Sequence, residues 1–514
     1  MSNFRHALNI KRDDDFAAWY QEVISAADMA EESGVRGCMV IKPWGYGIWE
    51  RIQRLMDDRI KAAGVQNCYF PIFIPLRNFE REAEHVEGFA KEMAVVTHHR
   101  LIADGKGGLV PDPEAKLEEP LVVRPTSETI IGDAMARWIQ SWRDLPLLTN
   151  QWANVVRWEM RTRMFLRTSE FLWQEGHTAH ANREDALAET HRALEMYRAC
   201  AEEDLALPVI AGEKPENERF PGAVETWSIE AMMQDGKALQ AGTSHYLGTN
   251  FAHAAGIKYQ DREGSEQYCH TTSWGVSTRM IGGVIMTHGD DDGLRVPPRI
   301  APYQVVILPM LRETPEDEPL LAYCEELRAG LAAQAAMGEP VRVLLDKSPG
   351  KAAAKRWDWV RKGAPVVIEV GPRDMAEGKV ALIRRDRLWN MENSKVAFQF
   401  VSREDAAAGI GALLADIQQS LFAEAAARRD ANITRGVTSL AEVEAHYSGD
   451  AKFPGWLEVQ WSKPGGAALD KVVETLKALK LTIRNVPRDA AAADGACIFT
   501  GEPAVERILI ARAY

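Results

Sequence analysis

The strongest chemical signal in the sequence is an arginine–glutamate pair followed by a basic loop. Val156-Arg157-Trp158-Glu159 ends one expected strand, and Arg167-Thr168-Ser169-Glu170-Phe171 opens the next. Alternation along a strand places Arg157 and Glu159 on one face. A guanidinium can bind two phosphate oxygens, and the ring of Phe171 offers a base a stacking plane. The pattern favours nucleotide binding, although an R-x-E pair alone also arises from surface ion pairs.

This pair resembles motif 2 of the class II aminoacyl-tRNA synthetases. In that family the first arginine binds the α-phosphate of ATP, the glutamate reads the adenine amino group and the phenylalanine stacks on the base. The resemblance gives these roles to Arg157, Glu159 and Phe171. It places Arg167 on the adenine side or at the outer phosphates.

A second segment, Ser273-Trp274-Gly275-Val276-Ser277-Thr278-Arg279, resembles motif 3 of the same class, in which a helix arginine binds the γ-phosphate. Gln240-Ala241-Gly242-Thr243-Ser244-His245 resembles the stretch that meets both ATP and the amino acid. The resemblance therefore implies Arg157 and Arg279 as catalytic residues, and Mg²⁺ bound with ATP near Gln240. The ATP-binding residues that it implies are Arg157, Glu159, Arg167, Thr168, Phe171, Gln240, Thr243 and Arg279.

Two further segments narrow the resemblance to the prolyl-tRNA synthetases. Arg124-Pro125-Thr126-Ser127-Glu128-Thr129 is similar to the T-x-E loop that binds the substrate ammonium group, and Trp173-Gln174-Glu175-Gly176-His177 resembles the wall of the proline pocket. The matches cover nearly the whole chain and are of the archaeal and eukaryotic type, which lacks an editing insertion. The implied proline-binding residues are Phe89, Thr126, Glu128, Arg157, Trp173, Glu175, His177, Phe220, His245 and Ser273.

The residue types suit this chemistry on physical grounds. A secondary ammonium with a small ring needs a carboxylate, a hydroxyl and an apolar-aromatic box, which Glu128, Thr126, Trp173 and Phe220 supply. The proline carboxylate must attack the α-phosphate, so two anions need screening by Arg157 and Mg²⁺. Positioning and electrostatic stabilisation can carry the rate without a side-chain nucleophile or general base.

The same residues also have ordinary structural explanations. Thr126 and Glu128 could cap the following helix, Trp173 could belong to a core, and Gln240 and His245 could be polar residues beside a turn. Threonyl- and glycyl-tRNA synthetases are the nearest rival families, but threonyl enzymes read their substrate through a zinc ion and no comparable pocket ligand set stands here. A non-catalytic relative that binds RNA would be expected to have lost the motif arginines or the motif glutamate.

The helices and strands expected around these residues indicate an α+β catalytic domain over 1–298. An apolar stripe over 48–63 predicts a helix ended by Gly64, and 68–75 is typical of a strand closed by proline. This pair resembles motif 1, which forms the homodimer interface in the class, so we expect a homodimer.

Further strands are expected at 153–158, 171–174, 223–233 and 273–286, and helices at about 128–142 and 183–204. Together they predict a large antiparallel sheet flanked by helices.

Alternating strands and helices predict a second, α/β domain at 299–402. Its segment Glu369-Val370-Gly371-Pro372-Arg373-Asp374 resembles the anticodon-binding domain of the family, which implies tRNA(Pro) as a partner. Residues 342–387 hold twelve Lys and Arg against six Asp and Glu, a net of +6 in a chain of net charge −13. That excess indicates either a solvated face or a phosphate-facing patch. The implied anticodon contacts are Arg356, Lys362, Glu369 and Arg373.

The remaining residues, 403–514, predict an alanine-rich helix and a small α/β C-terminal domain. Many relatives carry four cysteines there that bind zinc, whereas Cys497 is the only one in the corresponding region, so no structural zinc is expected. In the family a terminal tyrosine, here Tyr514, folds back towards the active site.

The composition is typical of a folded globular protein, and we expect the protein to be cytoplasmic. The apolar share is 46% and the charged share 26%, and the amino terminus has no apolar signal core. No uninterrupted apolar run is long enough to span a bilayer, so no membrane is expected. The six cysteines are scattered without a C-x-x-C pair, which argues against a disulfide framework. Between His177 and Gln240 there is no room for a separate editing domain.

Overall fold

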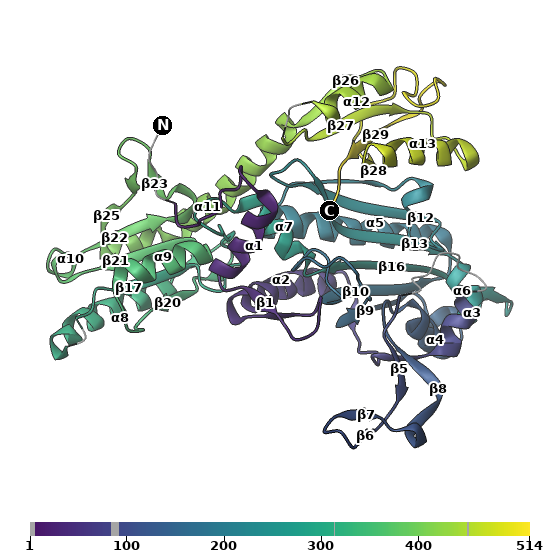
Figure 1. Ribbon diagram of the computed structural model, residues 1–514, viewed down its shortest axis with the longest axis horizontal. Helices are drawn as coiled ribbons and strands as arrows, with labels where there is room; N and C mark the ends of the chain where they lie inside the picture. Colours follow the sequence, from purple (N-terminus) through teal and green to yellow (C-terminus); the bar gives the residue numbers. More distant parts are fainter. Residues whose placement is uncertain (1–5, 84–91, 313, 450–451) are drawn as a thin grey trace.

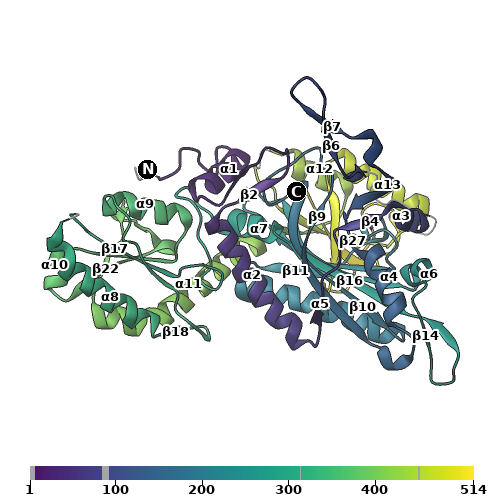
Figure 2. The same ribbon diagram turned by 90° about the horizontal axis from the view of Figure 1, so that it is seen from below.

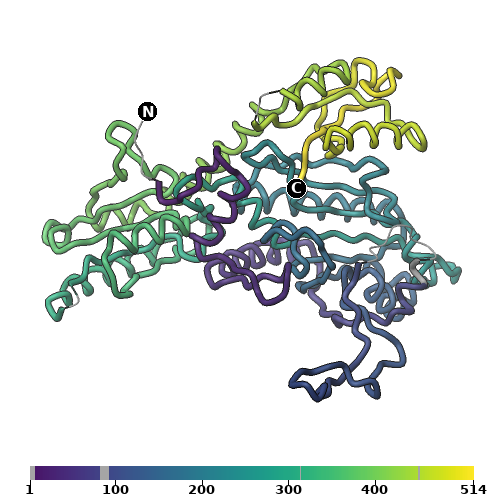
Figure 3. The backbone as a smooth tube through the Cα atoms, viewed as in Figure 1, coloured from purple at the N-terminus to yellow at the C-terminus, as the bar shows by residue number. Residues whose placement is uncertain are grey.

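The computed structural model describes residues 6–83, 92–312, 314–449 and 452–514. Three regions follow one another along the chain (Figure 1): a large sheet with its helices in purple to teal, an α/β module in green, and a C-terminal part in yellow. The long helix α11 (Arg403–Ala431) runs from the module to the C-terminal part, and its course is clear in the tube view of Figure 3.

In the described residues, eleven strands form one sheet in the order β26-β27-β29-β28-β11-β12-β13-β16-β10-β9-β3. The strands from β11 to β9 pair in antiparallel fashion, as expected, whereas β3 joins β9 in parallel. The strands from the catalytic region are β3 (Gln66–Asn67), β9 (Leu147–Val156), β10 (Glu170–His180), β11 (Val209–Glu213), β12 (Glu225–Met232), β13 (Ala238–Gly248) and β16 (His270–Ser277). The C-terminal strands extend the same sheet, a continuity that the sequence did not indicate.

Helices cover this sheet and carry its motifs. They are α1 (Phe16–Ala26), α2 (Pro43–Ala62), α4 (Glu128–Trp138), α5 (Arg183–Ala199) and α7 (Arg279–His288), and a short π-helix, η3 (Cys200–Asp204), continues α5. Proline suits the start of α2 because the first-turn N–H has no helical partner, and Gly64, at φ +83°, follows its end. Figure 2 shows α2 and α5 side by side below the sheet.

Two expected strands were longer than the observed ones. The expectation of a strand over 273–286 was wrong beyond Ser277, because β16 stops there and α7 begins at Arg279. Met280, Ile281, Val284 and Ile285 are all buried, and their spacing fits one face of a helix. Of the expected strand over 68–75, only β4 (Phe73–Pro75) is extended and paired.

Smaller elements surround the core. They are β1 (Ala30–Glu32), β2 (Met39–Ile41), α3 (Leu76–Ala83), β5 (Val95–His98), β6 (Leu101–Ala103), β7 (Leu109–Pro111), β8 (Lys116–Val123), α6 (Asn250–Ala255), β14 (Lys258–Gln260) and β15 (Glu266–Tyr268). The hairpin of β6 and β7 projects away from the body in both ribbon views (Figures 1 and 2).

The green module is a five-stranded sheet in the order β20-β17-β21-β22-β25. Its first three strands are parallel, as the alternating strand and helix pattern predicts, and the last two pair in antiparallel fashion. The elements are β17 (Val305–Pro309), α8 (Glu318–Ala332), β20 (Val343–Leu345), α9 (Ala352–Lys362), β21 (Val366–Val370), α10 (Pro372–Ala376), β22 (Lys379–Arg384) and β25 (Gln399–Ser402). Two short pairs complete it: β18 (Ala335–Ala336) with β19 (Glu339–Pro340), and β23 (Trp389–Asn390) with β24 (Lys395–Val396).

The C-terminal part contains β26 (Ile433–Val437), α12 (Leu440–Ser448), β27 (Trp456–Trp461), α13 (Gly466–Ala478), β28 (Thr482–Pro487) and β29 (Glu506–Ala511). Within the described residues, α11 is one helix with the length and apolar composition of a membrane span. That is weak evidence, because a core helix of a soluble protein passes the same test. Its residues Ile410, Leu414, Ile417 and Leu421 are buried in the core of the module.

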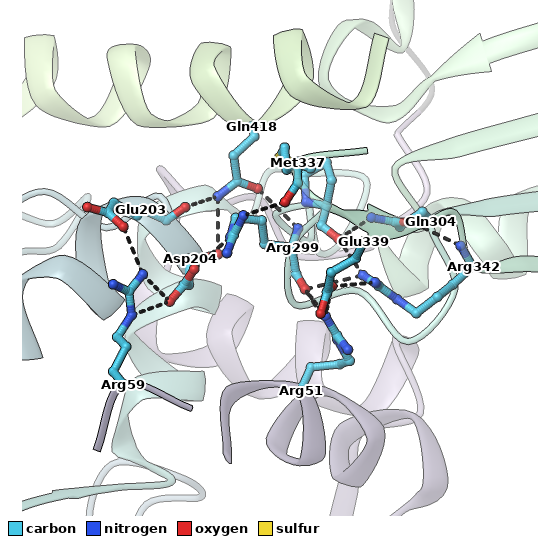
Figure 4. A network of polar contacts seen from close by, with 11 residues as sticks. Arg51, Arg59, Glu203, Asp204, Arg299, Gln304, Met337, Glu339, Arg342 and Gln418 are labelled. Atoms are coloured by element: carbon cyan, nitrogen blue, oxygen red, sulfur yellow. Dashed lines mark hydrogen bonds and ion pairs between the residues drawn. The ribbon is translucent and has the colours of Figure 1, made fainter. Parts of the chain in front are cut away.

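A buried polar network joins the catalytic region to the module (Figure 4). Asp204 is fully buried and accepts hydrogen bonds from Arg59 of α2 and from Arg299 of the connecting segment. Gln418 of α11 bonds the backbone of Asp204 and of Arg299. Glu339 pairs with Arg51 of α2. Because α2, the connecting segment, the module and α11 all contribute, this network fixes their relative arrangement.

Candidate active site

The floor of the candidate active site is formed by three neighbouring strands, β10, β16 and β13. The W-x-E-x-H side chains of β10 alternate, so all three lie on one face of the sheet. The register aligns Glu175 with Gly275 and Thr243, and His177 with Ser273 and His245. Gly275 places no side chain between Glu175 and Thr243, which keeps the middle of the floor open.

A cavity of about 490 Å³ lies over this floor. Most of the residues predicted from the sequence line it: Thr126, Glu128, Arg157, Glu159, Phe171, Trp173, Glu175, His177, Phe220, Gln240, Thr243, His245, Ser273 and Arg279. Residues from the strands β10, β13 and β16, from the helices α4 and α7 and from several loops thus converge on one space. The sequence reasoning missed Glu218, Arg219, Pro221 and Thr226, which also line the cavity. An E-R-F-P turn ahead of β12 was the available signal for them.

One end of the cavity is acidic. Thr126 Oγ1 donates a hydrogen bond to Glu128 Oε2, so the T-x-E pair faces the cavity as a unit. Glu175 Oε1 accepts hydrogen bonds from Ser127 Oγ and from Gln151 Nε2, both at 2.5 Å. Its other oxygen lies 2.9 Å from His177 Nε2. These contacts hold two carboxyl groups beside a space that a small cation could occupy.

The other end of the cavity is basic. Arg157 Nε donates to Pro125 O at 2.9 Å, and the Arg157 guanidinium lies 5.5 Å from the ring centre of Phe171 and 5.7 Å from that of Trp173. Burial lowers the pKa of Arg157, and the nearby carboxylates of Glu128 and Glu175 act against this. A buried guanidinium over aromatic rings is well placed to bind an anion.

Arg279 is the second cation of the basic end, and its Nε donates to Leu166 O at 3.0 Å. Burial, followed by repulsion from Arg157 and Arg167, lowers the pKa of Arg279 to about 10. A polyanion between the two partly buried arginines would offset that repulsion. The cavity therefore has one end suited to an ammonium group and another suited to phosphates.

The pKa values of two histidines beside the acidic end are shifted in opposite directions. Burial opposes the charged form of His177, but its hydrogen bond to Glu175 and the charges of Glu175 and Glu128 raise the pKa of His177 above 6.5. Burial lowers the pKa of His245 to about 4. Thr226 Oγ1 lies 3.0 Å from His245 Nδ1, and the rings of Phe220 and His245 lie 4.8 Å apart. His245 is therefore a neutral part of the cavity wall at neutral pH.

Three of the predicted site residues are not among those lining the cavity. Phe89 lies outside the described residues. Arg167 is mostly exposed and pairs with Glu159, its Nε lying 2.9 Å from Glu159 Oε2. Thr168 is buried beside the loop that connects Arg157 to Phe171. In this structure Arg167 is thus ion-paired with Glu159, the residue that was predicted to read the adenine amino group.

The chain terminus folds back onto the catalytic region. Tyr514 Oη donates to Asp235 Oδ2 at 2.5 Å, and Tyr514 N donates to Ala238 O at 3.1 Å. The guanidinium of Arg163, in the loop between Arg157 and Arg167, lies 5.5 Å from the Tyr514 ring centre. The last residue of the chain therefore touches the loop that carries the basic end of the site.

Comparison with known proteins identifies the family. The tRNA synthetase class II core domain (G, H, P, S and T) matches residues 112–288, and the anticodon binding domain matches residues 304–405. A proline–tRNA ligase of Erythrobacter litoralis is 77% identical over 100% of both chains, and one of Sphingopyxis alaskensis is 73% identical over 99% of this chain and 96% of its own. The chain belongs to the prolyl-tRNA synthetase family.

A solved structure agrees with this assignment. The prolyl-tRNA synthetase of Cryptosporidium parvum, complexed with L-proline and AMP, is 36% identical, covers 99% of this chain and 97% of its own, and superposes with a TM-score of 0.86. The predicted fold class is thereby confirmed, as is the prediction of an ATP-dependent ligase of the prolyl-tRNA synthetase family.

The predicted anticodon residues of this synthetase do not form one cluster. Arg356 of α9 pairs with the buried Glu369 of β21 at 2.9 Å. Arg373 is highly exposed and pairs with Glu377. Lys362 is the last residue of α9, and its carbonyl accepts a hydrogen bond from Trp44 of the catalytic region. Many cations of the +6 segment are also ion-paired, which favours the solvated-face interpretation for those side chains.

An aromatic pair near Arg356 escaped the sequence analysis. The guanidinium of Arg356 lies 5.5 Å from the ring centre of Phe398, and Phe398 stacks with Phe400 at 6.2 Å. Phe400 is 64% exposed. Exposed rings beside an arginine suit the unstacked bases of a single-stranded RNA loop. The F-x-F spacing of Phe398 and Phe400 was the available signal.

Proposed function

We propose that the protein activates L-proline with ATP, giving prolyl-adenylate and pyrophosphate, and then transfers proline to the 3′ end of tRNA(Pro). The observation that carries this is the two-ended cavity, with Glu128 and Glu175 at one end and Arg157 and Arg279 at the other. Prolyl-adenylate has a ring ammonium at one end and a phosphate at the other. Both groups of residues line the same cavity of about 490 Å³, as one bound prolyl-adenylate requires.

In the first step a carboxylate oxygen of proline attacks the α-phosphorus of ATP. The new O–P bond forms as the bond to the β-phosphate oxygen breaks, and pyrophosphate leaves with that electron pair. Arg157 holds the α-phosphate and Arg279 the outer phosphates, so both stabilise charge that develops in the transition state. Glu128 and Thr126 hold the ammonium, and Trp173 and Phe220 enclose the ring.

The second step transfers the activated proline. A terminal ribose hydroxyl of the tRNA attacks the carbonyl carbon of the adenylate, and AMP leaves with the electrons of the broken C–O bond. Gln240 and Thr243 contact the nucleotide, Glu159 reads the adenine amino group, and Phe171 stacks on the base. Positioning of both substrates supplies the rate in each step.

Mg²⁺ fits the cavity as a companion of ATP. Gln240 lines the cavity and carries an amide oxygen, and Mg²⁺ in such sites takes one or two protein oxygens together with substrate phosphates. The ion would neutralise phosphate charge during activation. Among the described residues, no group of three or more His, Cys, Asp and Glu side chains is placed to hold a metal by itself.

The module at 299–402 binds the anticodon arm of tRNA in this proposal. Arg356 and the ring pair Phe398 and Phe400 form its base-reading patch, with Arg373 and Lys362 available to phosphates. The catalytic domain spans 1–298 and the C-terminal domain 403–514, without zinc. The architecture is of the archaeal and eukaryotic type, which the 99% coverage by a Cryptosporidium enzyme supports. The site of action is the cytoplasm, where translation consumes charged tRNA.

The protein acts as a homodimer in this proposal. Around the motif 1 strand, Tyr69 is 73% exposed and Phe73 46% exposed, although both are large aromatic residues. The projecting β6–β7 hairpin also exposes Leu101 and Leu109. Exposed apolar side chains gathered in patches mark protein interfaces, and two-fold pairing is the commonest assembly. Light scattering at micromolar concentration tests the assembly.

Proline-dependent ATP–pyrophosphate exchange is the direct test of the function. The purified chain should exchange labelled pyrophosphate into ATP with proline, and far less with threonine or glycine at equal concentration. It should then charge tRNA(Pro) but not tRNA(Thr). Exchange that depends on threonine or glycine instead would assign the protein to a rival class II specificity.

A further inference from the structure

The C-terminal domain reaches the candidate active site through the sheet. Its strand β28 pairs with β11 of the catalytic region, with Gly212 opposite Pro487 and Glu213 opposite Val486. A Cβ atom at Gly212 would lie 2.2 Å from Val486 O, so only glycine permits this close approach. The yellow C-terminal strands accordingly lie along the catalytic sheet in Figure 1.

A buried ion cluster forms at this seam. Arg484 of β28 donates two hydrogen bonds to Glu230 Oε2, from Nε at 3.1 Å and from Nη2 at 2.8 Å. Lys214 Nζ lies 2.8 Å from Glu230 Oε1, which also accepts from Ser228 Oγ at 3.0 Å. Burial disfavours the charged carboxylate, but Arg484 and Lys214 together lower the pKa of Glu230. Glu230 is completely buried, and Lys214 and Arg484 are nearly so.

The ion cluster supports one wall of the cavity. The chain segment that forms this wall begins at Lys214. The segment after it contains η4 (Glu216–Glu218) and then Arg219, Phe220 and Pro221, and Glu218 to Pro221 line the cavity. Strand β11 ends at Glu213, directly before Lys214. The cluster therefore lies at the point where the wall leaves the sheet.

Hydrogen bonds continue from Lys214 to the acidic end of the cavity. Lys214 N donates to Thr226 O at 2.7 Å. Thr226 Oγ1 then accepts from Phe220 N at 3.0 Å and lies 3.0 Å from His245 Nδ1. Phe220, Thr226 and His245 all line the cavity. A displacement of Lys214 would thus move the wall that encloses the substrate ring.

We propose that Arg484 is a positioning residue for amino-acid activation, through which the C-terminal domain sets the wall around the proline ring. Arg484 fixes Glu230, Glu230 fixes Lys214, and Lys214 fixes Phe220 and His245 by way of Thr226. The C-terminal domain is then part of the activation machinery and not an appendage for tRNA. The role in proline binding rests on the proposed function.

The test compares Arg484→Met with a matched control, Arg507→Met. Arg507 lies in the same domain and is ion-paired with Glu458 and Asp494, but it does not touch the cluster. Arg484→Met should raise the KM for proline about 10-fold or more with a much smaller change in the KM for ATP, because misplacement of a contact wall costs rates of this order. Arg507→Met should stay within about 2-fold of the wild type in both constants.

Removing one member of a buried cluster can also prevent folding, so a second variant separates the two effects. The triple variant Lys214→Met/Glu230→Met/Arg484→Met replaces all three charges by apolar groups, a change that is often neutral or stabilising. A folded triple variant with a raised proline KM supports the proposal. A folded variant of either kind with a wild-type proline KM overturns it.

Hydrogen exchange makes the result independent of the assumed substrate. In Arg484→Lys, which keeps the charge but loses the two-pronged contact, the amides of Lys214 and Phe220 should exchange faster than in the wild type. Unchanged protection of both amides in this variant would refute the positioning role. If the wild type supports ATP–pyrophosphate exchange with another amino acid and not with proline, the proposed function fails. The hydrogen-exchange result on the positioning role still stands in that case.

Discussion

Asp204 Oδ1 and Arg299 Nε lie 2.6 Å apart where the catalytic region passes into the anticodon-binding module. The other oxygen of Asp204 accepts hydrogen bonds from Arg59 Nε at 3.2 Å and Nη2 at 3.0 Å. Asp204 therefore neutralises two arginines from different regions while it is itself completely buried. Its neighbour Glu203 also pairs with Arg59 but lies mostly in solvent.

This arrangement predicts that Asp204→Ala destabilises the protein by about 1.5–3 kcal/mol, because two partly buried arginines lose a charged hydrogen-bond partner. Charging of tRNA should fall more than ATP–pyrophosphate exchange, since the module loses its fixed orientation. Glu203→Ala is the matched control and should change stability by less than about 1 kcal/mol. Denaturant unfolding and the two assays measure these effects. Equal losses for both variants would contradict a special role of the buried carboxylate.

Arg157→Ala and Arg279→Ala should each abolish most proline activation while the protein stays folded. Each loses a charge-assisted phosphate contact worth about 2–4 kcal/mol in the transition state, or roughly 30- to 1000-fold in rate. Arg143→Ala removes an equal charge from an exposed position beside Trp142 and should leave the exchange rate unchanged. Near-normal exchange in either site variant would remove that residue from the assignment.

Local pattern accounts for the part of the site that could be predicted from the sequence. The alternation of Trp173, Glu175 and His177 needs only a strand to bring the three together, and the helix start at Arg279 follows from one motif. The misjudged strand over 273–286 came from an apolar run whose period is ambiguous when it is short. Gly275 and Thr243 fall opposite Glu175 only through the strand register, which no single segment encodes.

Long-range pairings account for what the sequence did not reveal. Arg484 and Glu230 are 254 positions apart, and only the union of two sheets brings them together. Glu369 and Arg356 were both expected to contact the anticodon arm, but in the fold they form an ion pair with each other. The exposure of the Phe400 ring depends on which face of β25 packs against the core, and a short segment does not reveal that face.

Glu128→Gln should raise the KM for proline far more than the KM for ATP. Its carboxylate lines the cavity and is hydrogen-bonded by Thr126, so the lost charge faces the substrate ammonium. A contribution of about 1.5–3 kcal/mol for a charged hydrogen bond predicts roughly a 10- to 100-fold change. Steady-state exchange kinetics at varied proline and ATP measure it. If both constants rise together, Glu128 serves mainly to begin α4.

The buried neutral histidine His245 should make the protein less stable in acid. Its pKa of about 4 in the folded state lies below 6.5, so the unfolded chain binds more protons between these values. The free energy of unfolding should therefore decrease as the pH falls from 6.5 towards 4, by up to about 3 kcal/mol for this group. His245→Gln should flatten that decrease, whereas replacing the exposed His99 should not. An unchanged slope in His245→Gln would show that His245 is not the group responsible.

The final prediction concerns discrimination against alanine, which is smaller than proline. Trp173, Phe220 and His245 enclose the ring end of the cavity, yet walls that admit proline cannot exclude a smaller side chain. Missing methylenes discriminate by only about 1–3 kcal/mol each. The enzyme should therefore form some alanyl-tRNA(Pro).

Hydrolysis of that product would need a second site, usually a domain of ~100 residues or more. Between the end of β10 at His180 and the start of β13 at Ala238, the chain forms only α5, η3, β11, η4 and β12, all of which belong to the catalytic region. We therefore expect no post-transfer deacylation by this protein. Purified alanyl-tRNA(Pro) should remain charged when the enzyme is added, with prolyl-tRNA(Pro) as the control. Rapid enzyme-dependent loss of alanine alone would mean that a hydrolytic site exists elsewhere in the fold.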